Sequence, residues 1–239
     1  MEGMPGLIEV WTLPVSPAVL QDHSLPKLLS SEENLRINRF HKPEDRARYI
    51  VAHVGLRSIL DQYFAIHKES QTFDRTRAGK PFLVKARGND PIYFSLAHSG
   101  ALVLIAVSRD MEIGVDVEAM DPTIDLSEAT AFCTPVEISW LSRLQVSQRI
   151  SALYRIWTIK EALAKAQGVG LRISLVEISV DLSAPDRPEV RHAIFPSRPW
   201  FVEELKAPLG YASAIAGLTN QAMVRQLDAS FHDGELLSH

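Results

Sequence analysis

The feature that most constrains the fold of this chain is a pair of short apolar segments near its middle. Residues 101–107 (ALVLIAV) are all aliphatic, and residues 113–118 (IGVDVE) follow after a turn at Ser108, Arg109 and Asp110. The aliphatic run is much too short to cross a bilayer, which needs about 20 apolar residues. We therefore expect two adjacent buried strands and no membrane-spanning segment.

The second apolar segment ends in two carboxylates. Asp116 and Glu118 are two residues apart, so on a strand both side chains project from the same face. Magnesium prefers oxygen ligands and is often bound by one or two carboxylates together with water and substrate phosphates. A solvated strand face with two acids gives the same short pattern, so the pair alone leaves both interpretations open.

A third carboxylate lies between two lysines in a strongly helical stretch, residues 157–165 (WTIKEALAK). Trp157, Glu161 and Lys165 recur every four residues and therefore share one helix face. Glu161 is a candidate third ligand for the same cation. An ordinary surface ion pair between Glu161 and Lys165 explains the spacing equally well. Lys160 leaves the helix about 100° away from Glu161 and is a weaker candidate.

Composition restricts the class of protein. The chain has 239 residues, enough for one large domain or two small ones, and its net charge of −4 lacks the basic excess of general nucleic-acid binders. The single cysteine, Cys133, excludes an internal disulfide, and we expect it to be a small core side chain. Residues 1–5 lack the basic and apolar regions of a secretory signal, so we expect a cytoplasmic protein.

Periodicity, caps and turn residues predict helices and strands in mixed order. Helices are predicted over residues 31–40, 43–64 and 147–167, the last ended by residues 168–170, and from Thr134, which has capping-box spacing to Glu137. Extended segments are predicted over residues 7–13, 73–84, 91–96, 176–182, 200–205 and 211–218, with a turn at 89–91 and a frayed tail at 230–239. Because no regular βαβ rhythm is present, we expect an α+β fold.

Five separated motifs occur in order along the chain. They are residues 40–48 (FHKPEDRAR), 79–81 (GKP), 94–100 (FSLAHSG), 114–118 (GVDVE) and 157–165 (WTIKEALAK). In these motifs, from about residue 36 to residue 171, the chain resembles the 4′-phosphopantetheinyl transferases of the surfactin-synthetase-activating type. The resemblance implies a pseudo-twofold pair of similar α+β halves with the active site in the cleft between them. We place a coenzyme A-binding half at residues 1–109 and a magnesium-binding, catalytic half at residues 110–239.

The resemblance also implies a reaction. The 4′-phosphopantetheine arm of coenzyme A is transferred to a serine of an apo acyl or peptidyl carrier protein, and adenosine 3′,5′-bisphosphate leaves. The implied cofactor is Mg²⁺, and the implied partners are coenzyme A and the carrier, with neither nucleic acid nor membrane. The class is typically monomeric. Carrier proteins are typically acidic, so an enzyme with negative net charge needs a local basic and apolar patch to bind one.

Site residues follow from matching the motifs position by position. The resemblance implies Asp116, Glu118 and Glu161 as magnesium ligands. It implies Glu161, Lys165 and His98 as catalytic residues: Glu161 helps to deprotonate the carrier serine, and Lys165 stabilises charge on the phosphates. His98 would donate a hydrogen bond to a phosphate oxygen. For Glu137, where the family also has an acid, we favour the capping role.

Contacts to coenzyme A are implied for a further set of side chains. This set comprises Arg36, Arg48, Lys80, His98, Ser99 and Lys165. Arg36 and Arg48 match positions at the 3′-phosphate, where the guanidinium fork suits phosphate geometry.

Three positions depart from the common family pattern. Ala97 lacks the hydroxyl that many relatives have before the histidine, and Tyr49 stands where a small hydroxyl residue is usual. Ser95 replaces a frequent asparagine, which implies the loss of a structural hydrogen bond. These departures affect the expected contacts to coenzyme A and leave the expected metal site unchanged.

Two other functions stay open on the sequence alone. A metal-dependent nuclease or phosphodiesterase also uses acid pairs and lysines, although the negative net charge argues against it. A non-catalytic module that binds coenzyme A or a carrier protein would keep the fold, although all three carboxylates and Lys165 are present.

Overall fold

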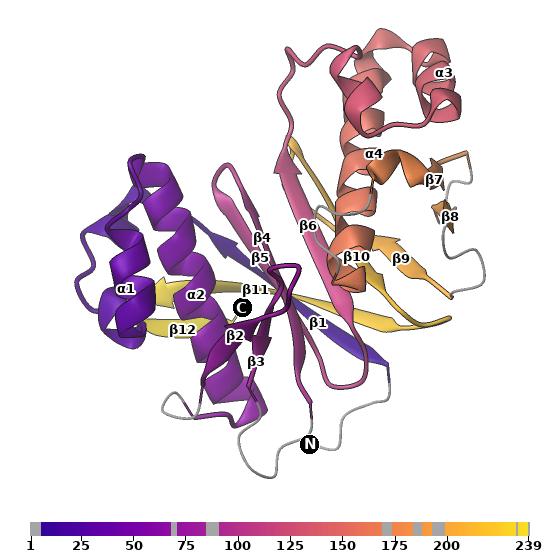
Figure 1. Ribbon diagram of the computed structural model, residues 1–239. Helices are drawn as coiled ribbons and strands as arrows, with labels where there is room; N and C mark the ends of the chain where they lie inside the picture. The colour runs from indigo at the N-terminus through magenta and orange to yellow at the C-terminus, as the bar shows by residue number, and fades with distance from the viewer. Residues whose placement is uncertain are drawn as a thin grey trace.

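The computed structural model describes residues 6–67, 71–84, 91–168, 174–183, 188–192, 199–232 and 234–238. Within these residues two halves lie side by side, and in each a 22-residue helix packs on a sheet (Figure 1). The intermixed helices and strands confirm the predicted α+β class. Among the described residues, none of the helices combines the length and the apolar composition that a bilayer crossing requires.

The first half is built on a five-stranded sheet in the order β12–β11–β1–β5–β4. Its strands are β1 (Leu7–Pro14), β4 (Tyr93–Ser99), β5 (Leu102–Ser108), β11 (Met223–His232) and β12 (Glu235–Ser238). Helix α2 (Pro43–Phe64) packs on one face of this sheet, and α1 (Ser31–Ile37) packs on α2. A separate hairpin is formed by β2 (Phe73–Arg75) and β3 (Pro81–Leu83).

The second half has a three-stranded sheet in the order β6–β10–β9. Its strands are β6 (Ile113–Ala119), β9 (Phe201–Glu204) and β10 (Tyr211–Gly217). Helix α4 (Val146–Gln167) covers this sheet, and α3 (Pro135–Arg143) and β7 (Ile178–Asp181), which pairs with β8 (Glu189–His192), pack against α4. The described 3-10 helices are η1 (Pro17–Leu20), η2 (Leu25–Leu28), η4 (Glu128–Ala131) and η6 (Leu175–Glu177).

The aliphatic run predicted as a buried strand lies at the centre of the molecule. The odd-numbered side chains of residues 103–107 pack with α2, and the even-numbered ones of residues 102–106 pack toward the second sheet. All residues of β5 are buried, which explains the uniform apolar run. Strands β5 and β6 are in contact as predicted, but each is hydrogen-bonded within a different sheet.

Most helix boundaries agree with the sequence. Helix α2 begins at Pro43 and α4 ends at Gln167, followed by Gly168 in the left-handed conformation. The capping box predicted at the start of α3 is present. Helix α1 is shorter than predicted and ends at Ile37. Residues 1–5, residues 89–90 of the predicted turn and residues 169–170 after α4 lie outside the described residues.

The prediction of a frayed tail at residues 230–239 is wrong. Strand β11 pairs in parallel with β1, and β12 pairs antiparallel with β11. Ala229 and Leu236 are buried in the core under α2, at 1% and 3% exposure. The C-terminal strands therefore complete the sheet of the first half, through long-range pairing with β1 that local sequence patterns do not reveal.

We expect Leu236→Ala to lower the free energy of unfolding by about 2–3 kcal/mol, because it empties a buried site under α2. Leu237 on the same strand is 45% exposed, so Leu237→Ala should change stability by about 0.5 kcal/mol or less. Urea unfolding of the two variants measures the difference. Equal effects would contradict the docking of β12.

Candidate functional site

Strand β6 and helix α4 are in direct backbone contact because residue 114 is a glycine. A Cβ at Gly114 would collide with Ala162 O and Ala166 N of α4 and would lie 2.8 Å from Lys165 Cβ. Hydrogen is the only substituent that fits there. The close packing holds the α4 face that carries Glu161 and Lys165 against the strand that carries Asp116.

Strands β4 and β6 and helices α2 and α4 together line a cavity of about 370 Å³, which we call the carboxylate cavity. Its lining residues are Ala52, His53, Leu96, Ala97, His98, Asp116, Glu118, Trp157, Glu161 and Lys165. All three predicted magnesium ligands and the predicted catalytic residues Lys165 and His98 are in this set. Three motifs that are far apart in the sequence therefore meet at one place.

Lys165 is bound to strand β6. Its Nζ atom donates to Asp116 Oδ1 at 2.7 Å and to Val115 O at 3.1 Å, so the lysine bridges α4 and β6. Asp116 is 4% exposed, and its other oxygen, Oδ2, is buried without a hydrogen-bond partner among the described residues. A buried carboxylate oxygen without a partner is costly, and a cation in the cavity would satisfy it.

Negative charge is crowded in the carboxylate cavity. Burial raises the pKa of Asp116, Glu118 and Glu161, and the charge of Asp116 raises the pKa of the other two further. Ser99 opposes this at Glu118, because its hydroxyl donates to Glu118 Oε2 at 2.8 Å. The same environment acts on His98, whose pKa is lowered by burial and then by the positive charges of Arg48 and Lys165.

The donor set of the cavity fits Mg²⁺. Among the residues that the structure describes, no three His, Cys, Asp or Glu side chains converge as a preformed metal cluster. However, three carboxylates line the same cavity, and Asp116 Oδ2 lacks a partner there. Magnesium typically completes its shell with water and substrate phosphates, so a partial set of protein ligands suits it.

We expect Glu161→Gln to stabilise the ligand-free protein at pH 7. The raised pKa means that the ionised side chain costs stability above that pKa, and the cost disappears when pH falls below the ordinary value of glutamate, about 4.3. The amide removes this cost, so the thermal midpoint should rise by about 2–4 °C at pH 7. The gain should vanish below about pH 4.

The exposed residue Asp125 provides a matched control. Its pKa is lowered by the hydrogen bond from the backbone N–H of Ser127 and then by the Ser127 hydroxyl, so Asp125→Asn should give no gain. Thermal melts from about pH 3 to about pH 8 measure both variants. A lower midpoint of Glu161→Gln at pH 7 would contradict the electrostatic account of the cavity.

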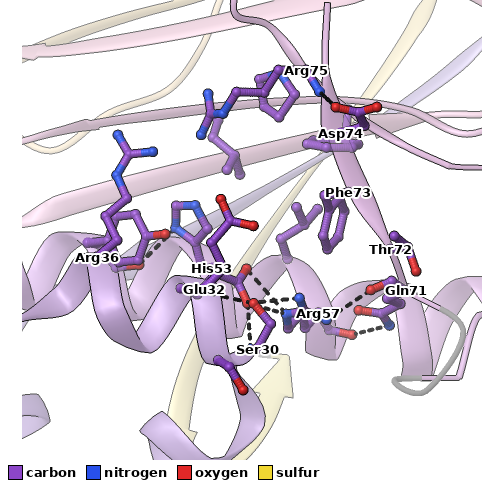
Figure 2. A pocket seen from close by; sticks show the side chains of 17 residues that line it. Ser30, Glu32, Arg36, His53, Arg57, Gln71, Thr72, Phe73, Asp74 and Arg75 are labelled. Atoms are coloured by element: carbon purple, nitrogen blue, oxygen red, sulfur yellow. Dashed lines mark hydrogen bonds and ion pairs between the residues drawn. The ribbon is translucent and has the colours of Figure 1, made fainter.

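A second cavity of about 500 Å³, which we call the arginine cavity, adjoins the first. Arg36 from α1 and Arg75 from β2 approach it from different sides (Figure 2). Arg57 at its base pairs with Glu33, and although burial raises the pKa of Glu33, the hydrogen bonds from Arg57 and Ser30 lower it below its usual value. His53 and Leu96 line both cavities, so the cavities adjoin at these two residues.

Three of the residues expected to contact coenzyme A form hydrogen bonds or ion pairs within the protein: Arg48, Lys80 and Ser99. Arg48 donates to Gly100 O at 2.9 Å and pairs with Asp45. Lys80 donates to Ile113 O at 3.1 Å and pairs with Glu112. Ser99, besides donating to Glu118, accepts a hydrogen bond from the N–H of Ala119 at 3.0 Å. Their contacts to coenzyme A therefore stay predictions.

The structure also places three residues that the sequence-based interpretation treated as minor or did not mention. Ser95 accepts a hydrogen bond from Val115 N at 3.1 Å, so the expected loss of a structural hydrogen bond is wrong. Lys160 is fully buried and pairs with Glu137, away from the cavity-lining face of α4. His53 was missed altogether. Its spacing of four residues from Tyr49 on α2 is visible in the sequence, but its position between the cavities depends on tertiary packing.

The fold has two α+β halves, and three carboxylates line the cavity between β4, β6, α2 and α4. Comparisons with known proteins identify the family. Residues 16–110 match the family model "4′-phosphopantetheinyl transferase, N-terminal". Residues 112–218 match the family model "4′-phosphopantetheinyl transferase superfamily".

Curated relatives agree with these matches. The chain is 36% identical to the 4′-phosphopantetheinyl transferase HetI of Nostoc sp., with 74% of this chain and 76% of the relative aligned. It is 30% identical to the 4′-phosphopantetheinyl transferase ffp of Bacillus subtilis, over 80% and 83%, and 27% identical to Sfp of the same species, over 78% and 81%. The chain belongs to the 4′-phosphopantetheinyl transferase superfamily and is a transferase of this class.

Proposed function

We propose that this protein transfers the 4′-phosphopantetheine arm of coenzyme A to a serine hydroxyl of an apo carrier protein. In this proposal residues 1–109 bind coenzyme A and contribute His98, and residues 110–239 supply the magnesium ligands and the catalytic residues Glu161 and Lys165. The observation that carries the proposal is the meeting of His98, the three carboxylates and Lys165 in one cavity. Family membership makes the same reaction the natural expectation.

The residues that line the two cavities suit coenzyme A. The carboxylate cavity, with Lys165 and His98 on its wall, would take the pyrophosphate, and the arginine cavity would take the adenosine 3′-phosphate. Arg36 is a favourable phosphate ligand because its guanidinium lies over the Tyr49 ring, at 5.4 Å from the centroid, and forms no ion pair within the described residues. The two cavities adjoin, as the two ends of one extended ligand require.

In the proposed reaction the serine oxygen attacks the phosphorus that carries the pantetheine arm. The bond from this phosphorus to the bridging oxygen breaks, and adenosine 3′,5′-bisphosphate leaves. Glu161 accepts the serine proton directly or through a water. Lys165 and His98 donate hydrogen bonds to phosphate oxygens and stabilise the charge on them.

Magnesium would be held by Asp116, Glu118 and Glu161. Its chemistry there would be to neutralise the pyrophosphate oxygens and to orient the leaving group. Two contacts orient these carboxylates: the Ser99 hydroxyl donates a hydrogen bond to Glu118, and Lys165 places a positive charge beside Asp116. Because the side chain of Lys165 is 32% exposed, its ammonium group has access to a bound phosphate.

We expect an acidic carrier protein, docking by its charge on a basic and apolar patch beside the cavity. We also expect one copy of the chain to be sufficient, with the enzyme acting as a monomer in the cytoplasm.

Release of adenosine 3′,5′-bisphosphate tests the proposed reaction. With coenzyme A and Mg²⁺, we expect the nucleotide to appear only when an apo carrier protein is added, in equal amount to the carrier modified. A phosphodiesterase would release nucleotide without a carrier, and a binding module would release none. Liquid chromatography of the reaction at several carrier concentrations measures the dependence, and either of these two results contradicts the proposal.

A further inference from the structure

His53 lies where the two cavities meet. It belongs to α2, and together with Leu96 it lines both the carboxylate cavity and the arginine cavity. Its ring stacks on the Tyr49 ring, with centroids 3.8 Å apart and planes inclined by 23°. Figure 2 shows Arg36 and Arg75 on the same cavity as this ring, and the charges of both arginines act on it. A fixed polar group at this junction faces the middle of any ligand that occupies both cavities.

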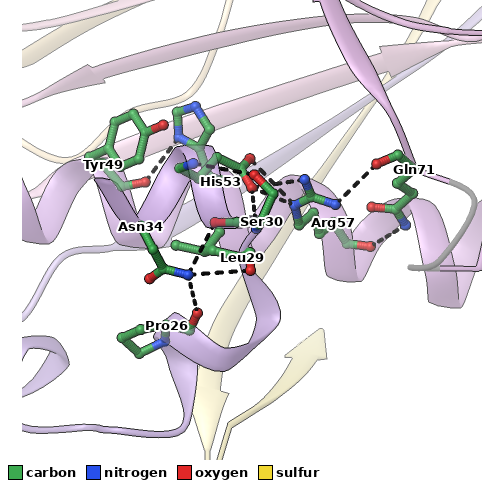
Figure 3. A network of polar contacts seen from close by, with 9 residues as sticks. Pro26, Leu29, Ser30, Asn34, Tyr49, His53, Arg57 and Gln71 are labelled. Carbon is green, nitrogen blue, oxygen red and sulfur yellow. Dashed lines mark hydrogen bonds and ion pairs between the residues drawn. The ribbon is translucent and has the colours of Figure 1, made fainter. Parts of the chain in front are cut away.

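The hydrogen bonding of His53 determines which of its nitrogens carries a proton. Nδ1 lies 3.0 Å from Tyr49 O (Figure 3), and a carbonyl oxygen only accepts, so Nδ1 must donate. Burial, together with the positive charges of Arg36 and Arg75, lowers the pKa of His53 to about 4 against the opposing charge of Glu33. The ring is therefore neutral at pH 7, and Nε2 keeps a free lone pair. His53 offers the junction a hydrogen-bond acceptor.

The chemistry of coenzyme A indicates which of its groups donates a hydrogen bond to Nε2 of His53. In coenzyme A the ribose lies between the pyrophosphate and the adenine, and its 3′ and 5′ oxygens are esterified. The 2′-hydroxyl is the one hydroxyl left on this sugar, and phosphate oxygens at neutral pH accept hydrogen bonds and would repel a lone pair. On the basis of the proposed function, we propose that His53 is a specificity-determining residue whose Nε2 accepts a hydrogen bond from the ribose 2′-hydroxyl.

Two substitutions separate the two nitrogens of the ring. In His53→Gln the longer amide places its oxygen near the position of Nε2, so an acceptor is retained. In His53→Asn the shorter amide keeps a donor near Nδ1 for Tyr49 O but leaves no group at Nε2. Both variants therefore introduce a side-chain amide of similar polarity, and they differ in whether an acceptor remains near the position of Nε2.

Calorimetric titration of the full-length protein with coenzyme A and 2′-deoxycoenzyme A tests the contact. We expect the wild-type protein to bind the deoxy analogue about 3- to 10-fold more weakly, as the loss of one hydrogen bond predicts. The discrimination should persist in His53→Gln and disappear in His53→Asn. Thermal melts of both variants check that the fold is intact, and the wild-type comparison tests the proposal even if a variant fails to fold.

3′-Dephosphocoenzyme A serves as the control ligand. The weaker binding that the missing phosphate causes should be the same in the wild-type protein and in His53→Asn. His53→Asn could instead bind coenzyme A and 3′-dephosphocoenzyme A equally well and still bind the 2′-deoxy analogue more weakly. In that case His53 contacts the 3′-phosphate, and the proposal is wrong. A wild-type protein that binds both ribose forms equally also overturns it. Failure of the wild-type protein to bind any coenzyme A would overturn the proposed function as well.

Discussion

Asp116→Ala is expected to reduce kcat/KM for carrier modification by about 1,000-fold or more, while the protein stays folded. Asp116 is the most deeply buried of the three carboxylates, and it is the residue that holds Lys165 on strand β6. Its loss would remove a proposed magnesium ligand and the anchor of the lysine at once. Activity is measured as the rate of carrier modification at saturating Mg²⁺.

Stability should survive this substitution. Burial raises the pKa of Asp116, which shows that its charge is unfavourable in the folded protein without a metal. Circular dichroism and a thermal melt check that Asp116→Ala is folded. Asp121 follows soon after the same strand and is exposed, so Asp121→Ala should keep nearly normal turnover. Near-normal turnover of Asp116→Ala itself would contradict the metal assignment.

Lys160→Met is expected to lower the free energy of unfolding by about 3–5 kcal/mol, because it leaves the buried carboxylate of Glu137 without its positively charged partner. Lys160 is completely buried, and its Nζ donates to Glu137 Oε2 at 2.6 Å and to Phe132 O at 2.7 Å. Glu137 in turn accepts from the backbone N–H groups of Thr134 and Val180. The network joins α3, α4 and β7, so its loss should loosen the support of α4.

Urea unfolding measures this effect, and two further variants define it. Arg155 pairs with Glu204 at a partly exposed site, so Arg155→Met should cost about 1 kcal/mol or less. Adding Glu137→Gln to Lys160→Met removes the stranded charge and should recover part of the loss. A cost below about 1 kcal/mol for Lys160→Met would show that the pair is not structurally important.

Local signals in the sequence predicted the elements near the site well. Pro43 and the Thr134 capping box mark true helix starts, and Gly168 follows the end of α4. These features depend on residues within one or two turns of each other, which is why they can be recognised without the fold. The position of Asp116 and Glu118 on a strand was predictable for the same reason.

Long-range arrangements were not predictable from single segments. Strand β11 carries a largely polar sequence and pairs with β1, more than 200 residues away along the chain, and β12 pairs with β11. Lys165 was expected near Glu161 or a phosphate, and the structure joins it to Asp116 because Gly114 brings β6 against α4. The junction of the cavities at His53 likewise exists only once α2 and β4 have packed.

The intact mass of an apo carrier protein after incubation with the enzyme, coenzyme A and Mg²⁺ tests the central claim most directly. The account predicts that the carrier gains the mass of one phosphopantetheine arm, at its serine, and that chelation of Mg²⁺ or the Asp116→Ala substitution prevents the gain. A panel of fatty-acid and peptide-synthetase carriers covers the partner classes. An unchanged mass for every carrier, with folded enzyme that binds coenzyme A, would contradict the assignment of the carboxylate cavity as a transferase site.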